Sequence, residues 1–119
     1  SKKNTLRGLH LQDSENKCCK MYFCIDGYTT SLQLDTRKSS PSYGQYLNIQ
    51  LNSKVPQLLY VPHGVATGFY FHQNAKIVYW QSESYRPKSE KIYNPSYFVD
   101  LLKLKNPIMS EKDKNSKIF

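Results

Sequence analysis

Apolar and polar residues alternate with a period of two along most of the chain. In an extended strand, successive side chains point to opposite faces, so this period is typical of half-buried β-strands. The pattern therefore predicts strands in four segments of the chain. These segments are residues 20–25, where Met21, Phe23 and Ile25 alternate with Lys20, Tyr22 and Cys24, and residues 31–35, 46–51 and 77–80.

Turn-forming residues separate the predicted strands and keep each of them short. Many short strands at close spacing favour an antiparallel sandwich or barrel, so we expect an all-β fold. The sequence predicts at most one short helix, near residues 95–102, where Asn94 can cap and Pro95 can take the first position. The turn signals are residues 26–27, 39–44, 52–56, 62–64 and 72–74.

The 119 residues predict one domain spanning 1–119. No run of 18 apolar residues is present, which excludes a transmembrane helix. No signal-peptide pattern opens the chain, so we expect a cytoplasmic protein. Cys18, Cys19 and Cys24 are odd in number and two are adjacent, which argues against a disulfide framework and favours reduced thiols.

Seventeen Lys and Arg against nine Asp and Glu give a formal net charge of +8. Such a surplus attracts polyanions: nucleic acid, anionic lipid or the phosphates of a small substrate. The lysines crowd the two ends of the chain, and no zinc-finger, helix-turn-helix or ribonucleoprotein pattern accompanies them. We therefore expect no nucleic-acid partner and no membrane insertion.

Several segments carry more specific motifs. Residues 5–12 read TLRGLHLQ, and with the other segments they resemble the dTDP-4-dehydrorhamnose 3,5-epimerase family, whose signature is L-R-G-L-H-x-Q. The resemblance runs nearly from end to end, in the family's order and spacing. The other segments are Lys20, residues 34–37 (LDTR), 40–46 (SPSYGQY), 57–69 (QLLYVPHGVATGF), 78–79 (VY) with 85–90 (YRPKSE), and 107–113 (PIMSEKD).

This resemblance implies a cupin-type jelly roll and an enzyme without metal or cofactor that acts, as a homodimer, on a nucleotide-diphosphate sugar. Its reaction would be 3- and/or 5-epimerisation of a 4-keto sugar in surface polysaccharide or deoxysugar biosynthesis. The match gives His10 the role of base and Tyr79 that of proton donor, and an unperturbed His pKa suits the first role. Arg7, Lys20 and Tyr85 match the substrate-binding residues.

The spacing of Arg7 and His10 carries a structural expectation of its own. Residues three apart in a strand point to opposite faces, so these two share a face only if Gly8 bends or bulges the strand. A metal site is not expected, because the chain has no H-x-H motif. The same absence disfavours a related cupin ketoisomerase.

Three departures from the family favour a second interpretation. Thr67 stands where the family usually has a histidine, and Asn94 takes the position that we align with the Asp supporting the catalytic His. The chain also begins almost at the signature, so we expect a domain that is shortened at its N-terminus relative to the family. The alternative function is therefore a non-catalytic, degenerate cupin that binds a sugar nucleotide or a partner protein.

Overall fold

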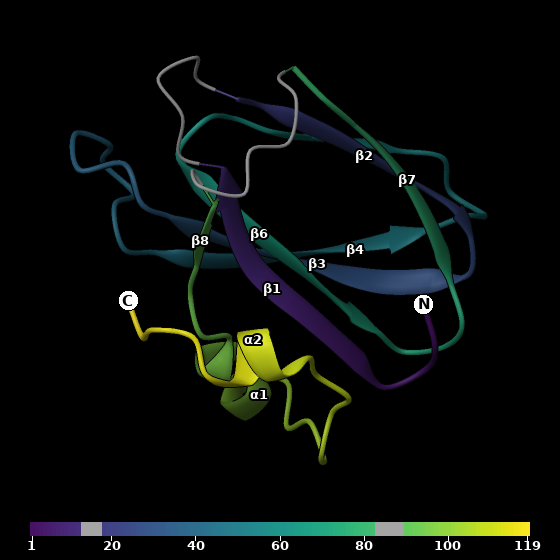
Figure 1. Cartoon of the computed structure of the whole chain (residues 1–119). Coiled ribbons are helices and arrows are strands. Elements are labelled where there is room, and N and C mark those ends of the chain that lie inside the picture. The colour runs from purple at the N-terminus through teal and green to yellow at the C-terminus, as the bar shows by residue number, and fades with distance from the viewer. Residues whose placement is uncertain (13–17, 83–89) are drawn as a thin grey trace.

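The computed structural model describes residues 1–12, 18–82 and 90–119 (Figure 1). Strands dominate these residues, and two short helices lie in the C-terminal part. The elements are β1 (Thr5–Gln12), β2 (Lys20–Asp26), β3 (Tyr28–Asp35), β4 (Tyr46–Asn52), β5 (Leu58–Val61), β6 (Val65–Phe71), β7 (Lys76–Gln81), β8 (Glu90–Ile92), α1 (Ser96–Leu101) and α2 (Glu111–Lys114).

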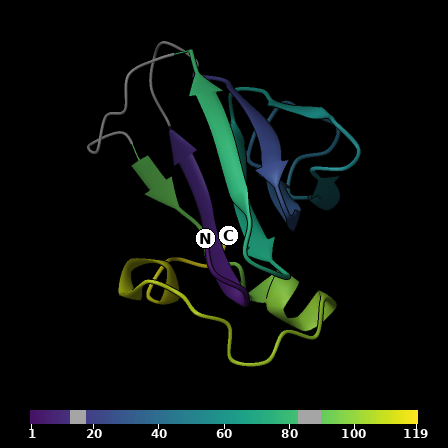
Figure 2. The same ribbon diagram turned by 90° about the vertical axis from the view of Figure 1, so that its right-hand side faces the viewer.

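The strands form two antiparallel sheets, one of five strands in the order β4-β3-β6-β1-β8 and one of three in the order β5-β2-β7. Figure 2 shows β8, β1 and β6 side by side, with both helices at one end of them. The predicted all-β jelly roll is confirmed. All four segments predicted from alternation are strands, namely β2, β3, β4 and β7.

The predicted helix is present as α1, and Asn94 Oδ1 accepts a hydrogen bond from the backbone N–H of Ser96 at its start, at 2.9 Å. The prediction of at most one helix was wrong, because the four residues Glu111–Lys114 form a second helix, α2. Ser110 caps this helix: its hydroxyl accepts from the backbone N–H of Asp113 at 3.1 Å.

The alternation predicted the position of β2 correctly, but its more apolar face is not the buried one. Met21 and Ile25 are 40% and 49% exposed, whereas Tyr22 and Cys24 are buried. The inner face of β2 therefore carries Lys20, Tyr22 and Cys24, and its more apolar residues point outward. The strand prediction needed only the period, but the direction depends on what each face meets.

Two apolar clusters lie on opposite faces of the five-stranded sheet. The first packs this sheet against α1, whose Phe98 is fully buried. The second fills the space between the two sheets. Its buried members are Tyr22, Cys24, Leu51, Val61, Phe69, Phe71 and Ala75, and those of the first are Leu6, Leu9, Leu11, Leu32, Leu34, Ala66 and Phe98.

A bulge interrupts the pairing of β1 with β6. The register shifts between Arg7 and His10, and Gly8 has a φ of 109°. A Cβ on Gly8 would lie 2.6 Å from the Cα of Gly68 on β6, so both positions need glycine for the strands to come this close. The bulge expected at Gly8 is thus confirmed.

Two further expectations concern thiols and membrane spans. Cys18, Cys19 and Cys24 are free cysteines, in agreement with the sequence analysis. Within residues 1–12, 18–82 and 90–119, no helix is long and apolar enough to cross a membrane.

Candidate functional site

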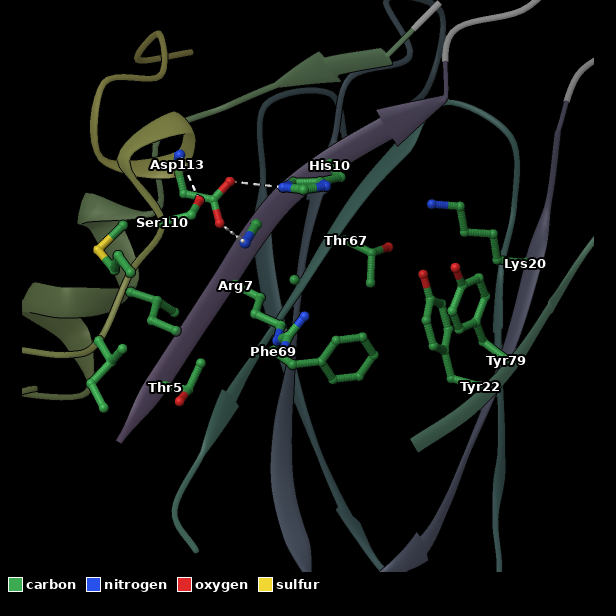
Figure 3. A pocket seen from close by; sticks show the side chains of 15 residues that line it. Thr5, Arg7, His10, Lys20, Tyr22, Thr67, Phe69, Tyr79, Ser110 and Asp113 are labelled. Atoms are coloured by element: carbon green, nitrogen blue, oxygen red, sulfur yellow. Dashed lines mark hydrogen bonds and ion pairs between the residues drawn. The ribbon is translucent and has the colours of Figure 1, made fainter. Parts of the chain in front are cut away.

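A cavity of about 550 Å³ opens between the sheets, which is within the usual size range of small-molecule sites. Arg7, His10, Lys20 and Tyr79, four of the residues selected from the sequence, line it together (Figure 3). Arg7 and His10 reach it from β1, and the other two reach it from the three-stranded sheet. The bulge at Gly8 lets Arg7 and His10 face the same space.

His10 forms a short hydrogen bond with a carboxylate. Its Nε2 lies 2.8 Å from Asp113 Oδ1, and the other carboxylate oxygen accepts a hydrogen bond from the Gly8 backbone N–H at 3.1 Å. Burial opposes ionisation of Asp113, but the hydrogen bonds from His10 and Gly8 outweigh it and hold its pKa below the usual value. An ionised carboxylate only accepts, so Nε2 carries a proton, and Nδ1, which lies 4.0 Å from Glu90 Oε1, is the nitrogen with a lone pair in the corresponding tautomer.

The C-terminal segment fixes Asp113 beside β1. The Ile108 carbonyl accepts from the N–H of Leu6 at 2.9 Å, and the N–H of Ile108 donates to the carbonyl of Asn4 at 2.7 Å. The Ser110 cap then holds the first turn of α2. Asp113 is buried at 4% exposure and uses one oxygen for the strand bulge and the other for the histidine.

The assignment of Asn94 as the partner of the histidine was wrong. Asn94 Nδ2 donates to the carbonyls of Lys114 and Ser116, both at 3.3 Å, and its Oδ1 accepts from Ser96. The amide therefore ties the start of α1 to the segment after α2, and Asp113 is the partner of His10. A carboxylate therefore does contact His10 in this chain.

Asp113 was missed although its segment had been matched to the family. Ser110 and Asp113 are spaced as a helix N-cap and its third residue, and that spacing signals a helix start that could have drawn attention to this carboxylate. Sequence proximity gave no such signal, because His10 and Asp113 lie 103 residues apart.

Lys20 and Tyr79 occupy the opposite wall of the cavity. Burial lowers the pKa of Lys20 below its usual value. The nearby Cys18 and Glu90 raise this pKa, but their effect is smaller than that of burial. The Tyr79 ring stacks on Tyr22, with centroids 5.5 Å apart and planes at 27°. Tyr79 is 55% exposed, so its hydroxyl can exchange protons with water.

Tyr22 is a further lining residue that the sequence analysis did not select. It is buried, burial raises its pKa well above the usual value, and its ring also packs edge-on against Phe69 with centroids 4.8 Å apart. Its position two residues after Lys20, on the same face of β2, was a signal that could have found it.

Of the remaining selected residues, Tyr85 lies outside the described residues, and Arg7 is exposed. Thr67 on β6 is a buried lining residue next to His10 in the strand pairing. No group of three His, Cys, Asp or Glu side chains that could hold a metal occurs among the described residues, and metal independence stays a prediction.

The cavity therefore combines a base with a hydrogen-bonded carboxylate on one side and an ammonium and a phenol on the other. Such a pair of walls can remove a proton from one face of a bound molecule and supply one to the other face. The ammonium can stabilise negative charge that develops between them.

Comparisons with known proteins identify the family to which the chain is similar. The model of the dTDP-4-dehydrorhamnose 3,5-epimerase family matches residues 1–119. The Salmonella typhimurium dTDP-4-dehydrorhamnose 3,5-epimerase is 38% identical over 91 residues, covering 76% of this chain and 50% of the relative.

Two solved structures superimpose on nearly the whole chain. The dTDP-4-dehydrorhamnose 3,5-epimerase from Elizabethkingia anophelis has a TM-score of 0.88 and 31% identity, covering 100% of this chain and 68% of that one. A dTDP-6-deoxy-D-glucose-3,5-epimerase from Legionella pneumophila, in complex with dTDP-4-keto-L-rhamnose, has a TM-score of 0.86 and 29% identity, covering 99% and 64%. The chain thus spans about half the length of the Salmonella relative and about two thirds of these two.

Proposed function

Because the chain belongs to the dTDP-4-dehydrorhamnose 3,5-epimerase family, we propose that it epimerises a nucleotide-linked 4-keto sugar at C3, C5 or both, in deoxysugar or surface polysaccharide biosynthesis. The observation that carries the proposal is the His10–Asp113 pair facing Lys20 and Tyr79 across one cavity. The dTDP-4-keto-L-rhamnose bound by the Legionella relative indicates the substrate class.

In the first step, His10 Nδ1 takes the proton from the carbon beside the keto group. The electron pair of the broken C–H bond moves into a new C–C double bond, and the carbonyl pair moves onto the C4 oxygen. The ammonium of Lys20 stabilises the enolate oxygen, and Asp113 stabilises the imidazolium.

In the second step, the Tyr79 hydroxyl returns a proton to the opposite face of the same carbon. The enolate pair forms the new C–H bond, and the phenolate regains a proton from water. His10 releases the abstracted proton to water, so no oxidant, metal or cofactor enters the balance.

Exposed cations suit the diphosphate part of the substrate. Arg7 lies at the cavity while being exposed, and a guanidinium can bind phosphate oxygens with two hydrogen bonds. The net charge of +8 adds a general attraction for an anionic ligand. Tyr85 remains a proposed substrate-binding residue from the motif match alone.

The non-catalytic alternative loses its main argument with the correction of Asn94. It depended on a missing carboxylate, and Asp113 lies 2.8 Å from the histidine. The substitution at Thr67 is then the departure within the site that needs a separate explanation.

Deuterium exchange tests the proposal directly. Incubated in D₂O with dTDP-4-keto-6-deoxy-D-glucose, the C3 and C5 epimer of dTDP-4-keto-L-rhamnose, the protein should exchange C–H protons at C3, C5 or both, as followed by NMR. His10→Asn should abolish exchange. Tyr79→Phe should retain exchange at one position while slowing inversion, because base action survives and proton return does not. Saturating binding without exchange by the wild-type protein would refute the epimerase function.

The outer face of β5-β2-β7 supports the proposal of a homodimer. The strand register places Met21, Tyr60 and Trp80 directly opposite one another, and Leu58 and Val78 lie on the same face two residues along. These five side chains are exposed by 37 to 64%, and an apolar surface of this kind is typical of an interface.

Light scattering after size exclusion tests the dimer. Trp80→Lys should convert a dimer to a monomer, and the control Ile118→Lys, at an apolar residue 71% exposed elsewhere, should not. A wild-type protein that stays monomeric at micromolar concentration would exclude the dimer.

We also propose a cytoplasmic location, which the three free thiols support because a reducing compartment preserves them.

A further inference from the structure

A row of polar side chains crosses the inner face of the five-stranded sheet. His10 on β1 pairs with Thr67 on β6, and Thr67 pairs with Gln33 on β3. Thr67 is only 4% exposed, and among the described residues its Oγ1 has no hydrogen-bond partner. By contrast, the buried Thr29 donates its hydroxyl proton to the carbonyl of Tyr70 at 2.8 Å.

A buried hydroxyl without a partner is unfavourable for folding, since it has lost its hydrogen bonds to water. The strand itself needs only the β-branched shape, which valine would supply without that cost. Gln33 Oε1, on the neighbouring strand, is also buried without a partner, so a hydrogen-bonding ligand group in the occupied cavity would complete the partners of this row.

The direction of this hydroxyl identifies the part of the ligand that it meets. Thr67 lines the cavity, and Figure 3 shows its hydroxyl on the side that faces Lys20, with the oxygen itself shielded from solvent. In the proposed reaction, a carbon beside the keto group lies against the base, and the keto oxygen is one bond further from it. That oxygen must then lie between the base and the ammonium.

We propose that Thr67 is a catalytic residue whose hydroxyl donates a hydrogen bond to the C4 oxygen of the 4-keto sugar, as a second donor beside Lys20. The inference rests on the proposed function. As His10 takes the proton and the electron pair reaches this oxygen, the Thr67 hydrogen bond strengthens. The hydroxyl keeps its proton throughout, so the balance of the reaction is unchanged.

Three variants at this position separate the hydroxyl from the methyl group. Thr67→Val removes the hydroxyl at nearly constant shape and should lower the rate of deuterium exchange into dTDP-4-keto-6-deoxy-D-glucose by about 10²-fold, the usual effect of losing one such donor. Thr67→Ser should stay within about tenfold of wild type. Thr67→Ala differs from Thr67→Ser by the hydroxyl alone, so this pair decides the matter if the valine variant fails to fold.

Stability gives the readout that a structural role would not produce. Thr67→Val should melt at or above the wild-type temperature, because no hydrogen bond within the described chain is lost. The matched control Thr29→Val loses the bond to Tyr70, so it should melt lower and keep the wild-type exchange rate.

The outcomes distinguish this inference from the proposed function. Wild-type exchange combined with unchanged exchange in both Thr67→Val and Thr67→Ala would overturn the role of Thr67 and leave the epimerase function standing. A lower melting temperature in Thr67→Val with unchanged exchange would also overturn it, since the hydroxyl would then be structural. Absence of both binding and exchange in the wild type would overturn the two together.

Discussion

Replacement of Asp113 by Asn should move the ring proton of His10 from one nitrogen to the other. The shape of the site stays nearly the same, because Asn and Asp are almost equal in size. The Gly8 N–H donates to one oxygen of Asp113 and still needs an acceptor in the variant. The amide oxygen must therefore stay on Gly8, and the amide NH₂ turns toward His10 Nε2. Because that group only donates, Nε2 has to accept, and the ring proton moves to Nδ1.

The magnitude follows from what this rearrangement removes. The wild-type base uses the lone pair on Nδ1, which the variant replaces with an N–H, and the charge that stabilises the imidazolium is also lost. In a Ser-His-Asp triad, the corresponding change costs about 10⁴ in rate through the wrong tautomer. We expect Asp113→Asn to lower the exchange rate by about 10³- to 10⁴-fold, equivalent to roughly 4–5.5 kcal/mol of activation free energy.

Two measurements check this prediction. Nitrogen NMR of the histidines should report Nε2–H in the wild type and Nδ1–H in Asp113→Asn, and deuterium exchange gives the rate. Asp100→Asn, at an exposed position on α1, is the matched control and should change neither. An Asp113→Asn variant with wild-type exchange, or with the proton still on Nε2, would refute the assigned tautomer.

Three other perturbations follow from the structure. Gly68→Ala places a Cβ 2.2 Å from the carbonyl oxygen of Arg7, so urea denaturation should show a loss of about 3 kcal/mol; an unchanged midpoint would mean that β1 and β6 are not this close. Hydrogen bonds from Arg37 hold the pKa of Asp35 well below its usual value, so its stabilisation is present above that value and is lost as the pH falls. Between about pH 5 and pH 3, the unfolding free energy of the wild type should fall more steeply than that of Asp35→Asn, and parallel curves would exclude the contribution. Chelation by EDTA should leave the melting temperature and the exchange rate unchanged, and a stoichiometric metal in purified protein would contradict this.

Alternation predicted four of the eight described strands, β2, β3, β4 and β7, because it depends only on the backbone period. The same argument failed for the faces of β2, where Lys20 and Tyr22 point inward to the cavity and Met21 points outward. A functional cavity replaces part of an apolar core, so polarity no longer marks the buried side. The bulge at Gly8 was predictable because two residues three apart had to share one face.

The partner of His10 was not predictable by the same means. Alignment of a shortened segment suggested Asn94, whereas the contact is made by Asp113. Local patterns describe which residues lie on one element, but they do not reveal which distant segment packs beside it. The unpaired hydroxyl of Thr67 likewise became visible only with the neighbours of β6 in place.

The pairing of β1 has a consequence for the order in which the chain folds. Arg7 pairs with Phe69, His10 pairs with Ile92, and Gly8 bonds to Asp113 across 105 residues of sequence. Each contact closes a long loop, whose entropy cost must be met before the contact contributes, so such pairings form slowly. Local hairpins such as β3–β4 can form first, and the pairing of β1 with β6 and β8 is expected to form later. The length of these loops therefore predicts that the imidazole acquires its carboxylate partner late in folding, after the local hairpins have formed.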